Sequence, residues 1–114
     1  MTTPSGKSPT SAAIEEISTA RMATILLCLR IENNSQWMRG KKRSIESIER
    51  YYLARYHAKQ RPDGDYELQV PYGSDAELDK TMDDLLSNIA NQADYRHCFS
   101  ETEARMVGTD RQWG

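Results

Sequence analysis

The segment 22–32, MATILLCLRIE, has the clearest alternation of apolar and polar positions in the chain. One alternate set is wholly apolar: Ala23, Ile25, Leu27, Leu29 and Ile31. A period of two is typical of a strand with one buried face. A helix over the same residues would be apolar all round, which suits only a fully buried helix. We therefore predict a strand, with a single helix over residues 11–33 as the alternative.

Two later segments have apolar residues at helical spacing. The first stripe is Ile45, Ile48, Tyr52 and Tyr56. Either Ser35 or Ser44 is a candidate N-cap for this helix. The second helix opens with Ser74 and has Glu77 three residues on, which is a capping box. Its stripe is Leu78, Met82, Leu85, Ile89 and Ala93.

The remaining elements are turns and strands. Residues 61–65, RPDGD, combine proline, aspartate and glycine and predict a turn. The alternation over residues 66–70 predicts a strand that ends at Pro71, and residues 57–60 give a short partner strand for a hairpin. After Tyr95, residues 97–107 alternate again and predict a last strand, with His97, Phe99 and Glu101 on the face opposite Cys98.

The order of these elements is β-α-β-β-α-β, which is the ferredoxin-like arrangement. We predict an α+β fold with a four-stranded antiparallel sheet and both helices on one face. The alternative is a mostly helical domain. Residues 1–20 are predicted to be a flexible arm with a short helix over 11–20, residues 21–107 a single domain, and residues 108–114 a tail. The sequence gives no role to Trp113 in that tail.

The composition is that of an ordinary folded domain. Of the 114 residues, 28% are charged and 38% are hydrophobic, which is not a disordered composition. No apolar run approaches the roughly 20 residues needed to cross a bilayer, and the first residues lack the apolar stretch of a signal peptide. We expect a cytoplasmic protein with no membrane contact. Cys28 and Cys98 lack C-x-x-C spacing and are expected to be buried, reduced thiols.

Charge is distributed unevenly along the chain. Residues 39–61 contain eight bases and two acids, whereas residues 63–110 contain twelve acids and three bases. Such asymmetry suggests a charged partner or head-to-tail self-association.

The densest basic stretch is a candidate nucleic-acid interface. It contains Trp37, Arg39, Lys41, Lys42 and Arg43. The bases would bind phosphates while the indole stacks on a base. Against this, the first strand has no stacking aromatic residue, and the pI of about 5.7 is low for a dedicated nucleic-acid binder. The alternative is that these bases are solvated and pair with the acid-rich half of the chain.

In the predicted fold, one face of the sheet has no helix over it. Six residues there are candidate contact residues: Leu26, Cys28, Arg30, His97, Phe99 and Glu101. This face is either a dimer interface or a solvated surface. His97, Glu101 and Glu103 suggest a metal or small-molecule site, but the roughly 20 Å of strand from His97 to Glu103 is too long for one ion to reach both ends.

The sequence has neither a G-x-S-x-G motif nor a glycine-rich phosphate loop. It assigns no catalytic residue and implies no cofactor, so a binding role is favoured over an enzymatic one. We predict a small binding protein that acts through self-association, as a homodimer, and through protein-partner recognition. Nucleic-acid binding by the basic stretch is the second hypothesis, and a metal or small-molecule site on the open face is the third.

Overall fold

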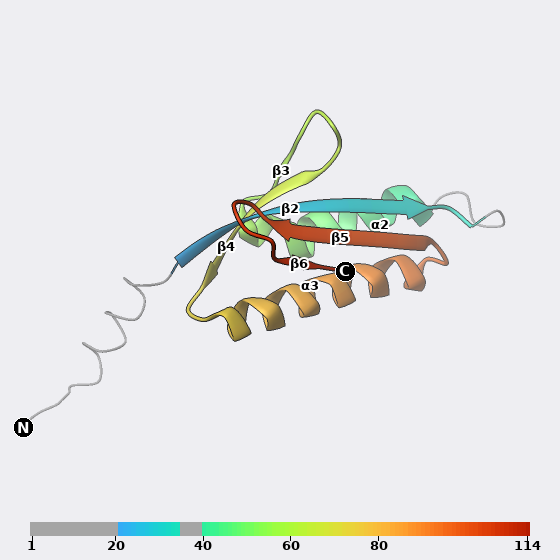
Figure 1. Cartoon of the computed structure of the whole chain (residues 1–114). Coiled ribbons are helices and arrows are strands. Elements are labelled where there is room, and N and C mark those ends of the chain that lie inside the picture. The colour runs from blue at the N-terminus through green and yellow to red at the C-terminus, as the bar shows by residue number, and fades with distance from the viewer. Residues whose placement is uncertain (1–20, 35–39) are drawn as a thin grey trace, which may run out of the picture.

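The computed structural model describes residues 21–34 and 40–114. This part of the chain forms an α+β fold, an antiparallel sheet with two helices packed against it (Figure 1). The strands are β2 (Arg21–Glu32), β3 (Lys59–Gln60), β4 (Tyr66–Tyr72), β5 (Phe99–Met106) and β6 (Gln112–Trp113). The helices are α2 (Gly40–Ile48) and α3 (Asp75–Tyr95). Predictions on residues 1–20, Ser35, Trp37 and Arg39 lie outside the described residues.

The strand prediction for residues 22–32 is confirmed. β2 pairs with β4 over residues 21–27 and with β5 over residues 25–32. Ile25, for example, lies opposite Leu68 in β4 and opposite Met106 in β5. The helical alternative is therefore wrong for the described residues 21–32.

Among the described residues the sheet has five strands in the order β3-β4-β2-β5-β6, and every neighbouring pair is antiparallel. The sequence predicted four strands. The fifth, β6, comes from the segment predicted as a tail and pairs with Ala104 and Arg105 of β5. The strand at the opposite edge of the sheet, β3, is also two residues long and pairs with Glu67 and Tyr66 of β4.

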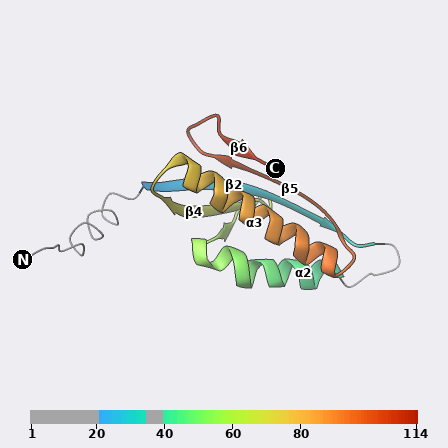
Figure 2. The same ribbon diagram turned by 90° about the horizontal axis from the view of Figure 1, so that it is seen from below.

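Both helices lie on the same side of the sheet (Figure 2). The core forms between them and the inward side chains of the three long strands. From the strands it takes Ala23, Ile25, Leu27, Ile31, Tyr66, Leu68, Val70, Tyr72 and Ala104, and from α3 it takes Leu78, Met82, Leu85, Ile89 and Ala93. The stripe predicted for α3 is therefore its buried face. Burial of each large apolar side chain contributes about 1.5–3 kcal/mol to folding.

Helix α3 begins as predicted. The Ser74 hydroxyl accepts a hydrogen bond from the Glu77 amide at 3.2 Å. The Glu77 carboxylate accepts one from the Gly73 amide at 2.7 Å, so it reaches one residue beyond the cap. The amides of Gly73 and Glu77 thus both have side-chain acceptors, which supply hydrogen bonds that the helix itself cannot provide at its start.

Helix α2 begins at Gly40, and the prediction of Ser44 as its N-cap is wrong. Ser44 is fully buried inside the helix, with its hydroxyl 3.4 Å from the Gln92 carbonyl of α3. The side chain of Asn33, at the end of β2, instead accepts a hydrogen bond from the Lys41 amide at 2.7 Å. After Ile48 the helix continues through a π turn (Glu49–Leu53) and a 3₁₀ turn (Ala54–Tyr56), which end at His57 in a left-handed conformation.

No helix in the described part of the chain is long and apolar enough to cross a membrane.

Candidate functional site

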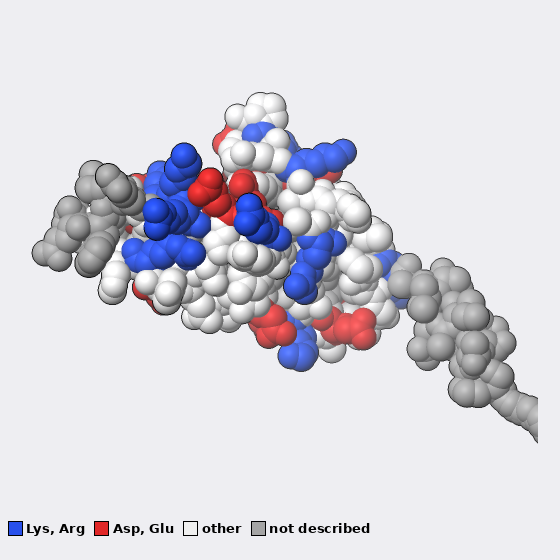
Figure 3. Space-filling model, turned by 180° about the vertical axis from the view of Figure 1, so that it is seen from behind, with Lys and Arg blue, Asp and Glu red and all other residues white. Residues whose placement is uncertain are grey.

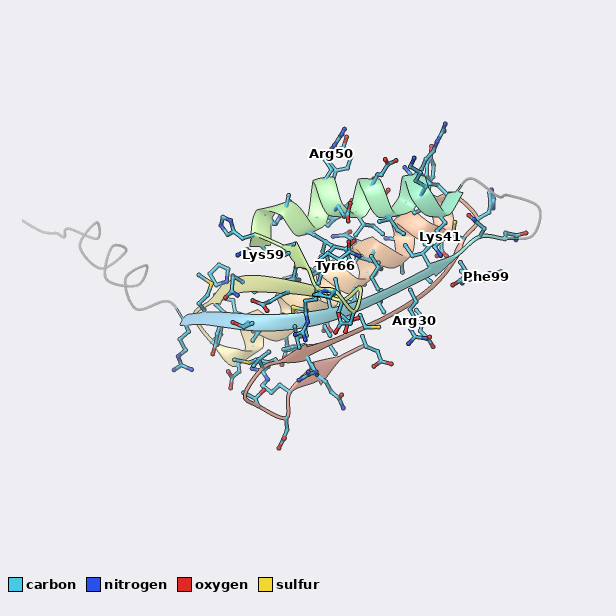
Figure 4. The ribbon with its side chains drawn as sticks, turned by 90° about the horizontal axis from the view of Figure 1, so that it is seen from above. Arg30, Lys41, Arg50, Lys59, Tyr66 and Phe99 are labelled. Carbon is cyan, nitrogen blue, oxygen red and sulfur yellow. The ribbon has the colours of Figure 1, made fainter. Side chains whose placement is uncertain are left out.

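The sheet face opposite the helices is formed by alternate residues of β2, β4 and β5. Arg30, Phe99 and Glu101 are exposed on it, Cys28 is half-buried, and Leu26 is only 9% exposed. Figure 4 shows Arg30 pointing away from the helices. Five of the six predicted residues of this face are thus brought together on adjacent strands.

Charged side chains of both signs occupy the middle of this face. Arg30 in β2 lies directly opposite Glu101 in β5, and Cys28 lies opposite Glu103. A hydrogen bond to the Cys28 side chain, then the charge interaction with that same side chain, and after it the negative charge of Glu101 raise the pKa of the Arg30 guanidinium. Arg105 follows on the same face of β5, opposite Leu26. Two bases and two acids therefore surround Cys28 and Leu26 and form the charged centre of this face.

Exposed apolar side chains lie at the two ends of the same face. Phe99, at the start of β5, is 66% exposed and lies opposite Glu32. At the other end, Met22 is 60% exposed and lies opposite Pro71, and Val107 is 46% exposed. These exposed apolar side chains lie at opposite ends of the face, on either side of its charged residues.

His97 does not belong to this face. It precedes β5 in a left-handed turn, with φ of 57°, because the strand begins only at Phe99. The residues that the structure describes contain no group of three histidine, cysteine or acidic side chains able to hold a metal ion. The structure therefore does not bring His97 and Glu101 together on one face for a metal site, and the small-molecule part of the third hypothesis stays a prediction.

The predicted basic stretch is described from Gly40 onward. Lys42 and Arg43 are exposed in the first turn of α2, and Lys41 is half-buried. Lysine and arginine side chains gather at this end of the helix (Figure 3). None of the ion pairs among the described residues joins α2 to the acidic helix α3. Among the described residues, therefore, no ion pair joins Lys41, Lys42 or Arg43 to the acid-rich half of the chain.

The structure also contains a cluster that sequence reasoning missed. Arg111 bonds to the carboxylates of Asp75 and Asp79 at the start of α3. The Trp113 indole donates to the same Asp79 carboxylate at 3.0 Å, and the Arg111 guanidinium lies 5.4 Å from the Trp113 ring centre. The indole hydrogen bond, together with the charge and hydrogen bond of Arg111, lowers the pKa of Asp79. This contact explains Trp113 as an anchor for β6.

A second unpredicted contact joins β4 to the turn after α2. The Tyr66 hydroxyl donates a hydrogen bond to the Glu49 carboxylate. Burial, and then that hydrogen bond, raise the pKa of Tyr66. The only sequence signal for it was a tyrosine on the inward face of a strand, where the hydroxyl needs a partner.

Comparisons of the chain with protein-family models, with curated proteins and with solved structures gave no match.

Proposed function

We propose that this protein acts by binding, and that its main interface is the open sheet face, which joins two copies of the chain as a homodimer. The observation that carries the proposal is the set of exposed apolar side chains on a face that no described element covers. Phe99 is the most exposed of them and lies at the edge of the charged centre. A location in the cytoplasm is part of the proposal, since Cys28 and Cys98 are free thiols.

Charge complementarity favours a second copy as the occupant. A two-fold axis brings the same surface of each copy together, so the surface must match itself. The open face meets this requirement because Arg30 and Arg105 share it with Glu101 and Glu103. A partner of one charge sign would leave half of these groups unpaired, which is costly at an interface.

The size of the face limits the strength of the contact. Strands of seven and eight residues span about 25 Å, and the three long strands are together about 15 Å wide, so each copy offers an area of about 400 Å². Two copies then bury about 800 Å², which is below the standard size for specific complexes. We therefore expect a dimer that dissociates on dilution.

Sedimentation velocity over about a hundredfold range of concentration tests this dimer. Phe99→Asp is expected to weaken dimerisation by at least about tenfold, because it places a charge in an apolar contact. Tyr95→Asp is the matched control. Tyr95 is also an exposed aromatic residue, 79% exposed, but it lies at the end of α3 and not on the open sheet face. A wild-type chain that remains monomeric at the highest concentration contradicts the proposal, and so does an equal effect of the two variants.

The second candidate function is nucleic-acid binding by the start of α2. The exposed bases Lys42 and Arg43, with Lys41 beside them, favour it because no acid of α3 neutralises them. Binding of short labelled DNA and RNA, measured by fluorescence anisotropy, should fall steeply with salt and be lost in a Lys41→Glu, Lys42→Glu, Arg43→Glu variant. An absence of binding at low salt contradicts it.

We also infer that the fold is ferredoxin-like, with β6 added at one edge. The succession β2, α2, β3, β4, α3, β5 supports this inference, as does the central place of β2 in the sheet. Cross-strand nuclear Overhauser effects from Ile25 to both Leu68 and Met106 are expected. Their absence on either side of β2 would contradict the arrangement.

A further inference from the structure

A hollow of about 680 Å³ lies on the outer surface of α2 and the turn that follows it, next to the end of α3. Three arginines line it. Arg43 lies in α2, Arg50 lies in the π turn that follows it, and Arg96 is the C-cap residue of α3. Its volume falls within the roughly 300–1,000 Å³ typical of small-molecule sites. The fold therefore collects three guanidinium groups that are up to 53 residues apart in the sequence.

Arg96 is held in place by a hydrogen-bonded link between the two helices. Its Nη1 donates to the Gln92 carbonyl at 3.2 Å and to Gln92 Oε1 at 2.9 Å. The same Oε1 accepts a hydrogen bond from the Ser47 hydroxyl of α2 at 2.9 Å. Because one nitrogen is fixed in this way, Nη2 and Nε remain as a pre-oriented pair of donors.

Neither Arg43 nor Arg50 forms an ion pair with another described residue. Two acids also line the hollow, Glu46 and Glu49. The Glu49 carboxylate keeps its negative charge while it accepts the Tyr66 hydroxyl. Both carboxylates of the lining therefore oppose an incoming anion, and the three arginines outnumber them.

We propose that this hollow binds the phosphate group of a small ligand. Guanidinium groups recognise phosphate oxygens with two parallel hydrogen bonds, and several of them together offset the charge of a diphosphate. Tyr51, 59% exposed, lies in the lining and offers an aromatic surface to the rest of the ligand. The site is independent of the open sheet face, because Arg50 and Arg30 project from opposite sides of the molecule (Figure 4).

Titration calorimetry of the full chain with inorganic pyrophosphate at low salt tests the site. Arg50→Gln is expected to weaken binding at least about tenfold, because it removes a charge-assisted pair. Arg96→Gln should have a similar effect. Glu46→Gln should instead strengthen binding by about threefold, because it removes the negative charge of one of the two carboxylates that line the hollow.

Lys59→Gln is the matched control, since Lys59 is an exposed base on β3, away from the hollow. It should change binding by less than about twofold, the effect of a distant screened charge. Circular dichroism melts establish that each variant is folded, and Arg50→Gln decides the test if Arg96→Gln unfolds. The proposal is overturned by no binding to the wild type, by equal losses in Arg50→Gln and Lys59→Gln, or by weaker binding in Glu46→Gln.

Discussion

At the scale of single residues, Gly40 has no room for a side chain. A Cβ placed there would lie 2.7 Å from the Arg96 carbonyl oxygen and 2.7 Å from the Cys98 sulfur. We therefore expect Gly40→Ala to lower the free energy of unfolding by about 1–3 kcal/mol, the cost of overpacking. A glycine-to-alanine change inside a helix would otherwise be favourable. Urea denaturation measures the difference.

Gly73→Ala provides the control for that measurement. The nearest atoms to a Cβ at Gly73 are those of the Glu77 carboxylate, at 3.0 Å, which accepts the Gly73 amide. The free energy of unfolding should fall by less than about 1 kcal/mol, the cost of weakening that cap hydrogen bond. Equal effects of the two substitutions would show that the contact with Arg96 and Cys98 is unimportant.

Gly40 and Ser44 show why the local sequence did not predict the start of α2 correctly. Gly40 reads as a weak helix position and Ser44 as a cap when only their neighbours are considered. The contacts that decide their roles come from Gln92, Arg96 and Cys98, about fifty residues later. By contrast, the Ser74 cap depends on residues three and four positions away, so its prediction was confirmed.

At the scale of elements, β6 is held both by its two-residue pairing with β5 and by the contacts that Trp113 and the preceding Arg111 make with α3. The folded-state pKa of Asp79 lies below its usual value, so its interactions stabilise the fold above the unfolded pKa of about 3.9. That contribution is lost as the pH falls from there through the folded pKa. We expect Asp79→Asn to be less stable than the wild type at neutral pH, with the difference shrinking on acidification.

Nuclear magnetic resonance provides the direct readout of this anchor. The indole proton of Trp113 donates to Asp79 and should shift as that carboxylate is protonated. In Asp79→Asn the acid-dependent shift should vanish. Gln112→Ala, an exposed neighbour on the same strand, should retain it. An indole shift that persists without Asp79 would mean that another acid titrates near Trp113.

The long elements were predictable, and so was the short strand β3, which the hairpin turn beside it indicated, but the short strand β6 was not. β2, β4 and α3 each repeat an apolar period over seven or more residues, so their faces could be read from the sequence. β5 alternates more weakly, with Ala104 its one fully buried residue, and its start was predicted two residues too early. A two-residue strand has no period. β6 depends instead on Arg111 and Trp113 meeting acids more than thirty residues earlier, a pairing that no local pattern reveals.

At the scale of the whole molecule, the charge asymmetry of the sequence becomes an asymmetry between two neighbouring helices. α2 is basic at its start, α3 is acidic at its start, and both lie on one side of the sheet (Figure 2). The sequence predicted the basic stretch and the open face. It could not predict the arginine hollow, because Arg96 joins Arg43 and Arg50 only through the packing of α3 on α2.

The open face carries a separate set of charges, and these should control dimerisation. Arg30→Glu removes a base opposite Glu101 and leaves the face acidic, so the two copies would repel each other. We expect the dimer dissociation constant to rise at least about tenfold. Adding Glu101→Arg restores both signs to the face and should return the constant to within about threefold of the wild type.

Added salt distinguishes this electrostatic contribution from the apolar one. The wild-type dimer should weaken between low and physiological ionic strength, because its charged pairs are screened at about 8–10 Å. Lys80→Glu reverses a charge on the exposed side of α3, where Lys80 pairs with Asp84, and should leave the dimer unchanged. If Arg30→Glu and Lys80→Glu weaken the dimer equally, net charge rather than the open face governs association, and the two copies meet through another surface.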